Sequence, residues 1–136
     1  MRKIATDIEQ GERLMAVGID PDTTADMCWM KTEDGYKLEV LQIPYHKDLF
    51  SHRNGITRPA WSLGALIGIL PATIKEKPKH VRHVYNHEFH LMIHKGYIEY
   101  DDGSLPAIDM SFLAHKGDLV DSAVNAIERL KKEGYF

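Results

Sequence analysis

The side chains in this sequence with the clearest potential for chemistry are its histidines. Five of the eight fall in one short segment, as His80, His83, His87, His90 and His94. On a helix, residues three or four apart lie about 5–6 Å apart at Cβ, so a pair such as His83 and His87 could chelate one metal ion. On a strand, the rise of about 3.3 Å per residue separates His90 from His94 by about 13 Å, too far for one zinc ion. Secondary structure therefore decides what these histidines can do.

The segment 81–101 favours paired strands over a helix. It is rich in β-branched and aromatic residues, and Lys95-Gly96 suits a two-residue turn. Such a turn sets three pairs on one face, which are His94–Tyr97, Met92–Glu99 and His90–Asp101. The opposite face is apolar and is expected to be buried, with Phe89, Leu91, Ile93, Ile98 and Tyr100.

This register predicts a candidate metal site at His90, Glu99 and Asp101, on the solvent-facing side of the hairpin. One imidazole and two carboxylates could bind a divalent metal ion or act as an acid–base set. Cross-strand charge pairing on a solvated sheet face is the simpler interpretation, and it needs no ligand. We therefore predict no catalytic residue and no cofactor, and keep a metal-dependent enzyme that uses this cluster as an alternative.

Other motifs with catalytic potential are weak. His87-Glu88-Phe89-His90 is one residue short of the zinc-protease motif, which has two residues between Glu and the second His. Cys28 is the only cysteine, lies in an apolar run, and is interpreted as a buried small hydrophobic residue. The chain has no glycine-rich phosphate loop and no Gly-x-Ser-x-Gly elbow.

A locally basic segment, 75–83, is the feature that suggests a nucleic-acid contact. It could touch phosphates or an acidic partner, but a solvated linker is the simpler interpretation. The net charge of −3 also argues against broad nucleic-acid binding, which requires a positive field. Nucleic acid is therefore not the expected partner, and a nucleic-acid-binding module remains an alternative.

The elements that must position these residues begin with a helix predicted at about 6–17. Thr6 and Glu9 form a capping box at its start, and Gly18 supplies a left-handed stop. The C-terminal helix is predicted at 118–132, with Asp118 as its cap. Its buried stripe consists of Leu119, Val120, Ala123, Val124, Ile127 and Leu130.

A central helix is predicted at 62–70, between the cap Ser62 and the helix breaker Pro71. It is apolar on nearly all sides, and a helix of that kind is normally buried. We therefore expect it to form the core of the domain. The residues after it, 72–80, are interpreted as a lysine-rich linker.

A first hairpin is predicted from strands at 27–31 and 36–43, joined by a turn at Asp34-Gly35. A two-residue turn there sets the pairs Lys31–Leu38, Trp29–Val40 and Met27–Gln42. Trp29, Tyr36, Leu38 and Val40 would share its buried face. Residues 44–59 read as a loop. Further along, Asp102-Gly103 suggests a second tight turn, and Pro106 an edge strand.

These elements predict an α+β fold in a single domain, 1–136. We expect an antiparallel sheet of about four to six strands, covered by the N-terminal, central and C-terminal helices. A chain of 136 residues buries roughly two thirds of its unfolded surface, enough for a core without disulfides.

Several features suggest a cytoplasmic protein. A single cysteine fits a reducing compartment. The N-terminus becomes acidic at Asp7, unlike a signal peptide. The longest apolar stretch, 60–70, is about half the length needed to span a bilayer, so no membrane contact is expected.

Four blocks distributed over the chain match a known family. They are Ile4-Ala5-Thr6-Asp7-Ile8-Glu9-Gln10, Ala25-Asp26-Met27 before Trp29, Pro59-Ala60-Trp61-Ser62-Leu63-Gly64-Ala65-Leu66 with Leu70-Pro71, and Val120-Asp121-Ser122-Ala123. Together they resemble an uncharacterised family of short proteins from gut Bacteroidales, often encoded in prophages or mobile elements. The resemblance implies a phage-like or mobile-element context and a helix–hairpin–helix–sheet–helix order, but no activity. It does not extend over 80–110, so the histidines look particular to this chain.

The function predicted from these observations is that of a small non-enzymatic accessory or interaction protein of phage or mobile-element origin. A protein partner or a homodimer is the expected kind of assembly. The alternatives remain the metal-dependent enzyme at His90, Glu99 and Asp101, or at His83 and His87, and the nucleic-acid-binding module at 75–83.

Overall fold

The computed structural model describes residues 3–41, 50, 57–75, 88–101, 111–113 and 118–136. Its helices are α1 (Ile8–Ala16), α2 (Pro21–Thr24), α3 (Leu63–Ile69) and α4 (Leu119–Lys132). Its strands are β1 (Met27–Thr32), β2 (Gly35–Val40), β3 (Thr57–Ala60), β4 (Thr73–Lys75), β5 (Glu88–His94), β6 (Tyr97–Asp101) and β7 (Ser111–Leu113). The fold is α+β, as predicted.

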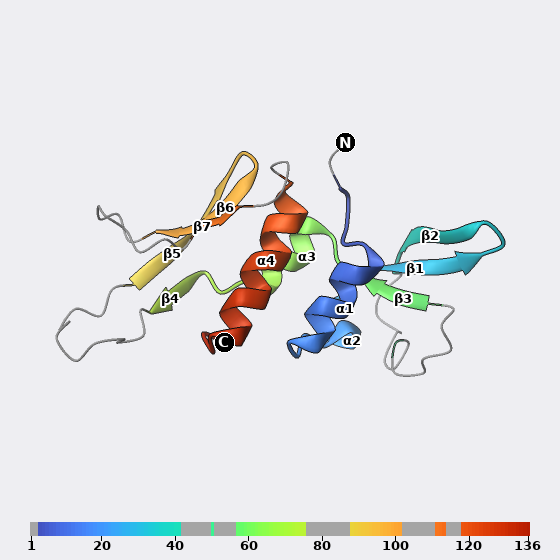
Figure 1. Ribbon diagram of the computed structural model, residues 1–136, viewed down its shortest axis with the longest axis horizontal. Helices are drawn as coiled ribbons and strands as arrows, with labels where there is room; N and C mark the ends of the chain where they lie inside the picture. Colours follow the sequence, from blue (N-terminus) through green and yellow to red (C-terminus); the bar gives the residue numbers. More distant parts are fainter. Residues whose placement is uncertain (1–2, 42–49, 51–56, 76–87, 102–110, 114–117) are drawn as a thin grey trace.

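The strands divide between two antiparallel sheets instead of forming one. The first has the order β2-β1-β3 and the second the order β4-β5-β6-β7. Figure 1 shows the helices in the middle of the molecule, with one sheet at either end. The division arises at α3, because this helix carries the chain from β3 in the first sheet to β4 in the second.

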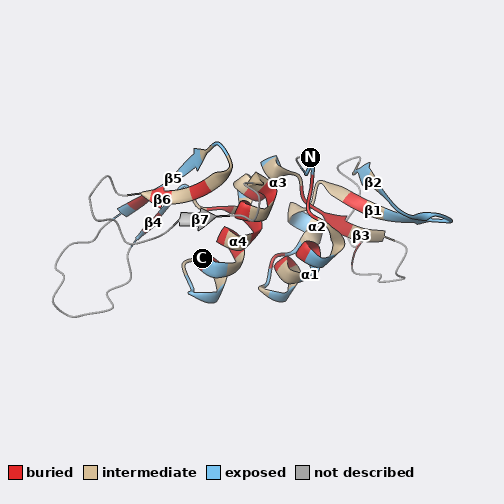
Figure 2. Ribbon diagram, turned by 45° about the horizontal axis from the view of Figure 1, so that its top comes forward, coloured by how far each residue is buried: buried red, intermediate tan, exposed pale blue. Residues whose placement is uncertain are grey.

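The core lies where the helices meet the nearest ends of the two sheets, as the buried segments in Figure 2 show. One cluster of buried side chains joins α1, α3 and α4 to β4, β5 and β6. Helix α4 contributes the largest share of it, with Val120, Ala123, Val124, Ala126, Ile127 and Leu130. Its predicted bounds and its cap are confirmed, because Asp118 accepts a hydrogen bond from the N–H of Val120 at 2.9 Å.

The N-cap of helix α1 lies one residue later than predicted, at Asp7, so the helix itself begins at Ile8. Its capping box consists of Asp7 and Gln10, since Asp7 Oδ1 accepts from Gln10 N at 2.8 Å and Gln10 Oε1 accepts from Asp7 N at 3.1 Å. The predicted cap, Thr6, is instead fully buried. The stop is as predicted: Gly18 has a φ of +96°, and the buried Ile19 donates its N–H to the last turn.

Helix α3 has the predicted cap, because Ser62 Oγ accepts from Ala65 N at 3.2 Å. The prediction that it forms the core of the domain is wrong. Leu66 is its only fully buried residue, and Gly64 and Gly68 face solvent. The two glycines leave one side of the helix without side chains, so α3 packs with its other side on α4.

The predicted register of the first hairpin is wrong by two residues. Trp29 lies opposite Leu38, and Met27 opposite Val40. The turn consists of Glu33 and Asp34, and Gly35 follows it with a φ of +123°, as in hairpins in which a turn precedes a left-handed glycine.

The predicted buried face of this hairpin is largely open. Val40 is 70% exposed and Tyr36 39% exposed, whereas Trp29 and Leu38 are half-buried. Cys28, on the opposite face, is buried as predicted.

Strand β3 lies within the segment predicted as a loop. Leu41 donates its N–H to Asp26 O. Because backbone bonding alternates along an antiparallel strand, every second residue of β1 from this point bonds to β2, and the residues between them, Met27 and Trp29, bond to β3. Pro59 lies between the bonding positions of β3 and needs no N–H for the ladder. This register is what lets a proline occupy the strand.

The β5–β6 hairpin has the predicted register. His94 lies opposite Tyr97, Met92 opposite Glu99, and His90 opposite Asp101. Gly96 in the turn has a φ of +91°. Of the predicted buried face, Phe89, Ile98 and Tyr100 are buried, Leu91 is half-buried, and Ile93 is exposed. The predicted linker 72–80 contains β4, which extends this sheet.

Several predictions concern residues outside the described ranges. These are the turn at Asp102-Gly103, the edge strand at Pro106, the basic residues 76–83, and His46, His52, His80, His83, His87 and His115. Within the described ranges, no helix is both long enough and apolar enough to cross a bilayer.

Candidate functional site

The three residues of the predicted metal site lie on the outer face of the β5–β6 hairpin. His90 is opposite Asp101, as predicted. Glu99 is directed instead to His94, whose Nε2 lies 2.7 Å from Glu99 Oε2. Among the residues that the structure describes, no three His, Cys, Asp or Glu side chains are grouped so as to hold a metal ion. The hairpin therefore presents a His94–Glu99 pair.

His94 and Tyr97 form a flat aromatic surface beside the turn of this hairpin. Their rings stack with centroids 4.4 Å apart and planes 11° apart. The His94–Glu99 contact is within hydrogen-bond distance, although the atoms are not aligned as a hydrogen bond. Cross-strand aromatic pairs contribute about 0.2–1 kcal/mol to a sheet. The three side chains therefore hold one another in place at the tip.

Apolar side chains are exposed next to this cluster. Met92 is 43% exposed on the same outer face, and Ile93 is 47% exposed on the inner face. Ile93 lies opposite the fully buried Ile98, but α4 packs over β6 and β7 and leaves this end of β5 open. We define Met92, Ile93, His94, Tyr97 and Glu99 as the hairpin-tip surface.

The other hairpin also exposes apolar residues, namely Met30, Tyr36 and Val40. Figure 2 shows exposed residues at the free end of the β1–β2 hairpin, away from the helices, and around the turn that joins β5 to β6. The alternation of Tyr36, Leu38 and Val40 predicts an apolar face. It carries no information on whether another element covers that face, which is why the exposure was not predicted.

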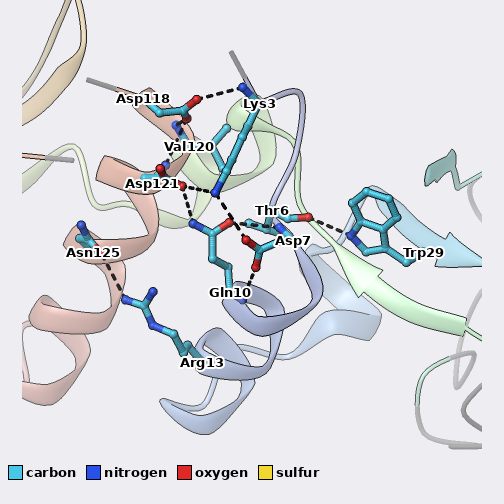
Figure 3. Close-up of polar contacts among 10 residues, drawn as sticks. All are labelled: Lys3, Thr6, Asp7, Gln10, Arg13, Trp29, Asp118, Val120, Asp121 and Asn125. Carbon is cyan, nitrogen blue, oxygen red and sulfur yellow. Dashed lines mark hydrogen bonds and ion pairs between the residues drawn. The ribbon is translucent and has the colours of Figure 1, made fainter. Parts of the chain in front are cut away.

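A second polar cluster joins the N-terminal segment to α4 (Figure 3). Lys3 Nζ lies 2.7 Å from Asp121 Oδ1 and 3.4 Å from Asp7 Oδ2. Lys3 also donates its backbone N–H to Asp118 at 2.9 Å, and Gln10 donates its side-chain amide to Asp121. These groups bond to one another, so the cluster fastens α1 to the start of α4.

The charges in this cluster shift one another's ionisation. Burial alone lowers the pKa of Lys3, but the hydrogen bond and charge of Asp121 outweigh it and raise that pKa. Burial alone raises the pKa of Asp118, but the backbone N–H groups of Lys3, Asp121 and Val120 outweigh it and lower that pKa. Both groups are therefore held in their charged forms.

The two tryptophans are structural. Trp61 is fully buried, and its Nε1 donates to Thr24 Oγ1 at 2.9 Å. Trp29 is half-buried, and its Nε1 donates to Thr6 O at 2.9 Å. Both ring nitrogens are thus bonded within the chain, and Trp61 belongs to the buried core cluster whereas Trp29 does not.

A cavity of about 490 Å³ lies between α1 and β3. Its described lining is mostly apolar and consists of Glu12, Met15, Ala16, Phe50, Thr57, Arg58 and Pro59. Its charged groups are Arg58 and Glu12, which form an ion pair at 3.5 Å. The two charged side chains in the described lining of this cavity therefore neutralise each other.

Cys28 is poorly suited to act as a nucleophile. Burial, and next to it the charge of Glu39, raises the pKa of its thiol. The reactive thiolate is therefore disfavoured, which agrees with the predicted role as a small hydrophobic residue.

Comparisons with family models, with curated proteins and with solved structures found no match to this chain.

Proposed function

We propose that this chain is a small interaction protein that binds a protein partner through the hairpin-tip surface. The observation that carries the proposal is the exposure of Met92 beside the stacked His94 and Tyr97 rings, with Ile93 exposed on the other face of the same strand end. Exposed apolar side chains next to aromatic rings and rimmed by a charge are typical of protein–protein contacts. The partner surface that fits is apolar at its centre, with a cation or hydrogen-bond donor facing Glu99.

The geometry of the tip favours binding with little loss of conformational entropy. The Lys95-Gly96 turn and the five residue pairs between β5 and β6 fix the backbone. The stack on Tyr97 and the contact with Glu99 fix His94. A surface that is already ordered before it binds avoids part of the cost of association.

The context proposed for this interaction is a prophage or mobile element. The four sequence blocks that resemble the Bacteroidales family support it. Phage or transfer genes beside the coding gene are the expected finding, and a consistent setting among housekeeping genes would contradict this part of the proposal.

The experiment uses the full chain with a photo-crosslinking amino acid in place of Met92. A protein captured in native cells is then purified, and its affinity for the unmodified chain is measured by calorimetry. The double variant Met92→Ser/Ile93→Ser is expected to weaken binding by roughly tenfold or more, since each lost apolar contact removes about 1 kcal/mol.

Met30→Ser is the matched control, because Met30 is exposed to a similar extent on the other hairpin. It is expected to leave the affinity unchanged. Equal effects of the two variants, or no complex between purified components, would overturn the proposed surface.

A further inference from the structure

Strand β2 is the most open sheet edge among the described strands. It is six residues long and ends its sheet, with β1 on one side only. The other three edges are protected: β3 contains Pro59, and β4 and β7 are three residues each. Proteins normally blunt exposed edges with such short strands or prolines, because an open edge pairs with other chains.

The backbone of β2 shows which residues face the open edge. Leu41 donates its N–H to Asp26 O at 3.0 Å. Backbone bonding alternates along an antiparallel strand, so Glu39 and Lys37 also face β1. The backbone groups of Leu38 and Val40 therefore point away from β1, toward the edge.

The side chains of β2 also alternate. Tyr36, Leu38 and Val40 share the apolar face, while Lys37 and Glu39 lie on the other face. Lys37 Nζ and Glu39 Oε1 are 3.4 Å apart, and the two side chains are 72% and 48% exposed. One opposite-charge pair on one face and three apolar residues on the other make the strand complementary to itself.

We propose that a second copy of this chain pairs with β2 in antiparallel register about Leu38. Leu38 lies opposite the partner's Leu38, and each exchanges backbone hydrogen bonds with the other. Tyr36 lies opposite the partner's Val40 on the apolar face. Lys37 lies opposite the partner's Glu39 on the charged face, twice by symmetry.

The charges select this register over its neighbours. The register can shift only in steps of two residues, because the backbone N–H and C=O groups that point to the open edge must face those of the partner strand. A shift in one direction sets Lys37 opposite the partner's Lys37, and a shift in the other sets Glu39 opposite the partner's Glu39. Like charges directly opposite each other destabilise a sheet. Only the register centred on Leu38 pairs opposite charges on both sides.

The assembly closes at two copies. The pairing has a two-fold axis through Leu38, so both copies use the same strand and neither leaves it open. The far edge of each sheet is β3, where the proline stands. The result is one six-stranded sheet built from two three-stranded ones. This contact uses the hairpin opposite the proposed partner surface, so either proposal can fail alone.

Charge reversal tests the proposal with the full chain, using sedimentation over a range of concentrations. Wild type is expected to show a monomer–dimer equilibrium. Lys37→Glu and Glu39→Lys should each raise the dimer Kd by roughly tenfold or more, because two attractive pairs become repulsive. Both positions are exposed, so the variants should keep the fold.

Two further samples make the result specific. The double variant Lys37→Glu/Glu39→Lys restores complementarity and should dimerise as wild type does. An equal mixture of the two single variants should form a heterodimer, since one chain then carries two acidic and the other two basic residues at these positions. A wild type that stays monomeric at all concentrations, or a mixture that stays monomeric, would overturn the proposal.

Hydrogen exchange locates the contact. Exchange of the Leu38 amide should slow as protein concentration rises, because this N–H becomes bonded only in the dimer. Exchange of the Lys37 amide should change little, because it already faces β1. Concentration-dependent protection elsewhere, with none at Leu38, would show that the copies meet at another surface.

Discussion

The Lys3 ammonium lies 2.7 Å from Asp121 Oδ1, across 118 positions of sequence. The backbone N–H of the same lysine donates to Asp118, the cap of α4. The N-terminal segment and the start of the C-terminal helix are thereby joined by one residue. Helix α1 also reaches Asp121, because the side-chain amide of Gln10 donates to this carboxylate.

This junction predicts a loss of stability in acid. The folded pKa of Asp118 lies below its ordinary value of 3.8. Its contribution is therefore complete above that value and is lost as the pH falls through the lower folded pKa. Asp118→Asn keeps a good helix cap but cannot ionise.

Asp118→Asn should cost less than about 1 kcal/mol near neutral pH, because solvent screens the partly exposed group. The difference from wild type should shrink as the pH falls below 3.8 and vanish once the pH lies below the lowered pKa of Asp118. Urea unfolding of both proteins across this range measures it. A difference in the free energy of unfolding that stays constant with pH would show that the charge of Asp118 contributes nothing to stability.

Arg13 and Glu128 form the second fastening between α1 and α4. The guanidinium Nε lies 3.0 Å from Glu128 Oε2, and Nη2 donates to Oε1 at 3.2 Å. The hydrogen bond from Arg13 lowers the pKa of Glu128. A double-mutant cycle with Arg13→Ala and Glu128→Ala should give a coupling free energy of about 0.5–1 kcal/mol, since the contact is two-pronged.

The control for that cycle is the more exposed Arg129–Glu133 pair at the C-terminal end of α4, in which Arg129 Nε lies 3.2 Å from Glu133 Oε1. Its coupling should be smaller, about 0.3 kcal/mol. Equal coupling free energies for the two pairs would mean that the contact between α1 and α4 stabilises the fold no more than a pair along one helix does.

The two hairpins show what local sequence can and cannot predict. Lys95-Gly96 forms the predicted two-residue turn, and the β5–β6 register follows from it. Asp34-Gly35 is compatible with two turns: one formed by both residues, or a Glu33–Asp34 turn followed by glycine. Both place Gly35 at positive φ, so the residue types do not distinguish them. The structure has the second, and every pair shifts by two.

The exposure of the candidate surfaces depends on tertiary structure more than the hairpin registers do. A shift of two leaves Trp29 and Leu38 on the same face, yet nothing in that pattern tells which end of the face the helices cover. Likewise, the apolar composition of α3 suggested a central helix, but the position of Gly64 and Gly68 at the surface depends on where α4 packs. The contact between Lys3 and Asp121 has no periodic signal at all.

Thr6 supplies a hydroxyl that the backbone of Trp61 requires. Thr6 Oγ1 accepts from Trp61 N at 3.1 Å, and Thr6 N donates to Trp61 O at 3.0 Å. Thr6→Val keeps the shape but leaves the buried Trp61 N–H without an acceptor, which should cost about 1–3 kcal/mol. Thr6→Ser keeps the hydroxyl and should cost less. Thermal and urea unfolding measure both, and a loss for Thr6→Val no larger than that for Thr6→Ser would show that the hydroxyl of Thr6 is not required.

Two helical glycines should respond in opposite ways to alanine. A Cβ on Gly11 of α1 would lie 3.0 Å from Pro59 O and 3.3 Å from Trp61 Cζ3, so the glycine permits the close contact of α1 with β3. Gly11→Ala should therefore destabilise the fold by about 1–3 kcal/mol, in spite of the helix preference of alanine.

A Cβ on Gly68 of α3 would meet nothing within 4 Å. Gly68→Ala should stabilise the fold by up to about 1 kcal/mol, because alanine loses less backbone entropy in a helix. Urea unfolding of the two variants measures the difference. Stabilisation by both would show that α1 can move away from β3 at no cost, and that Gly11 is not required for their packing.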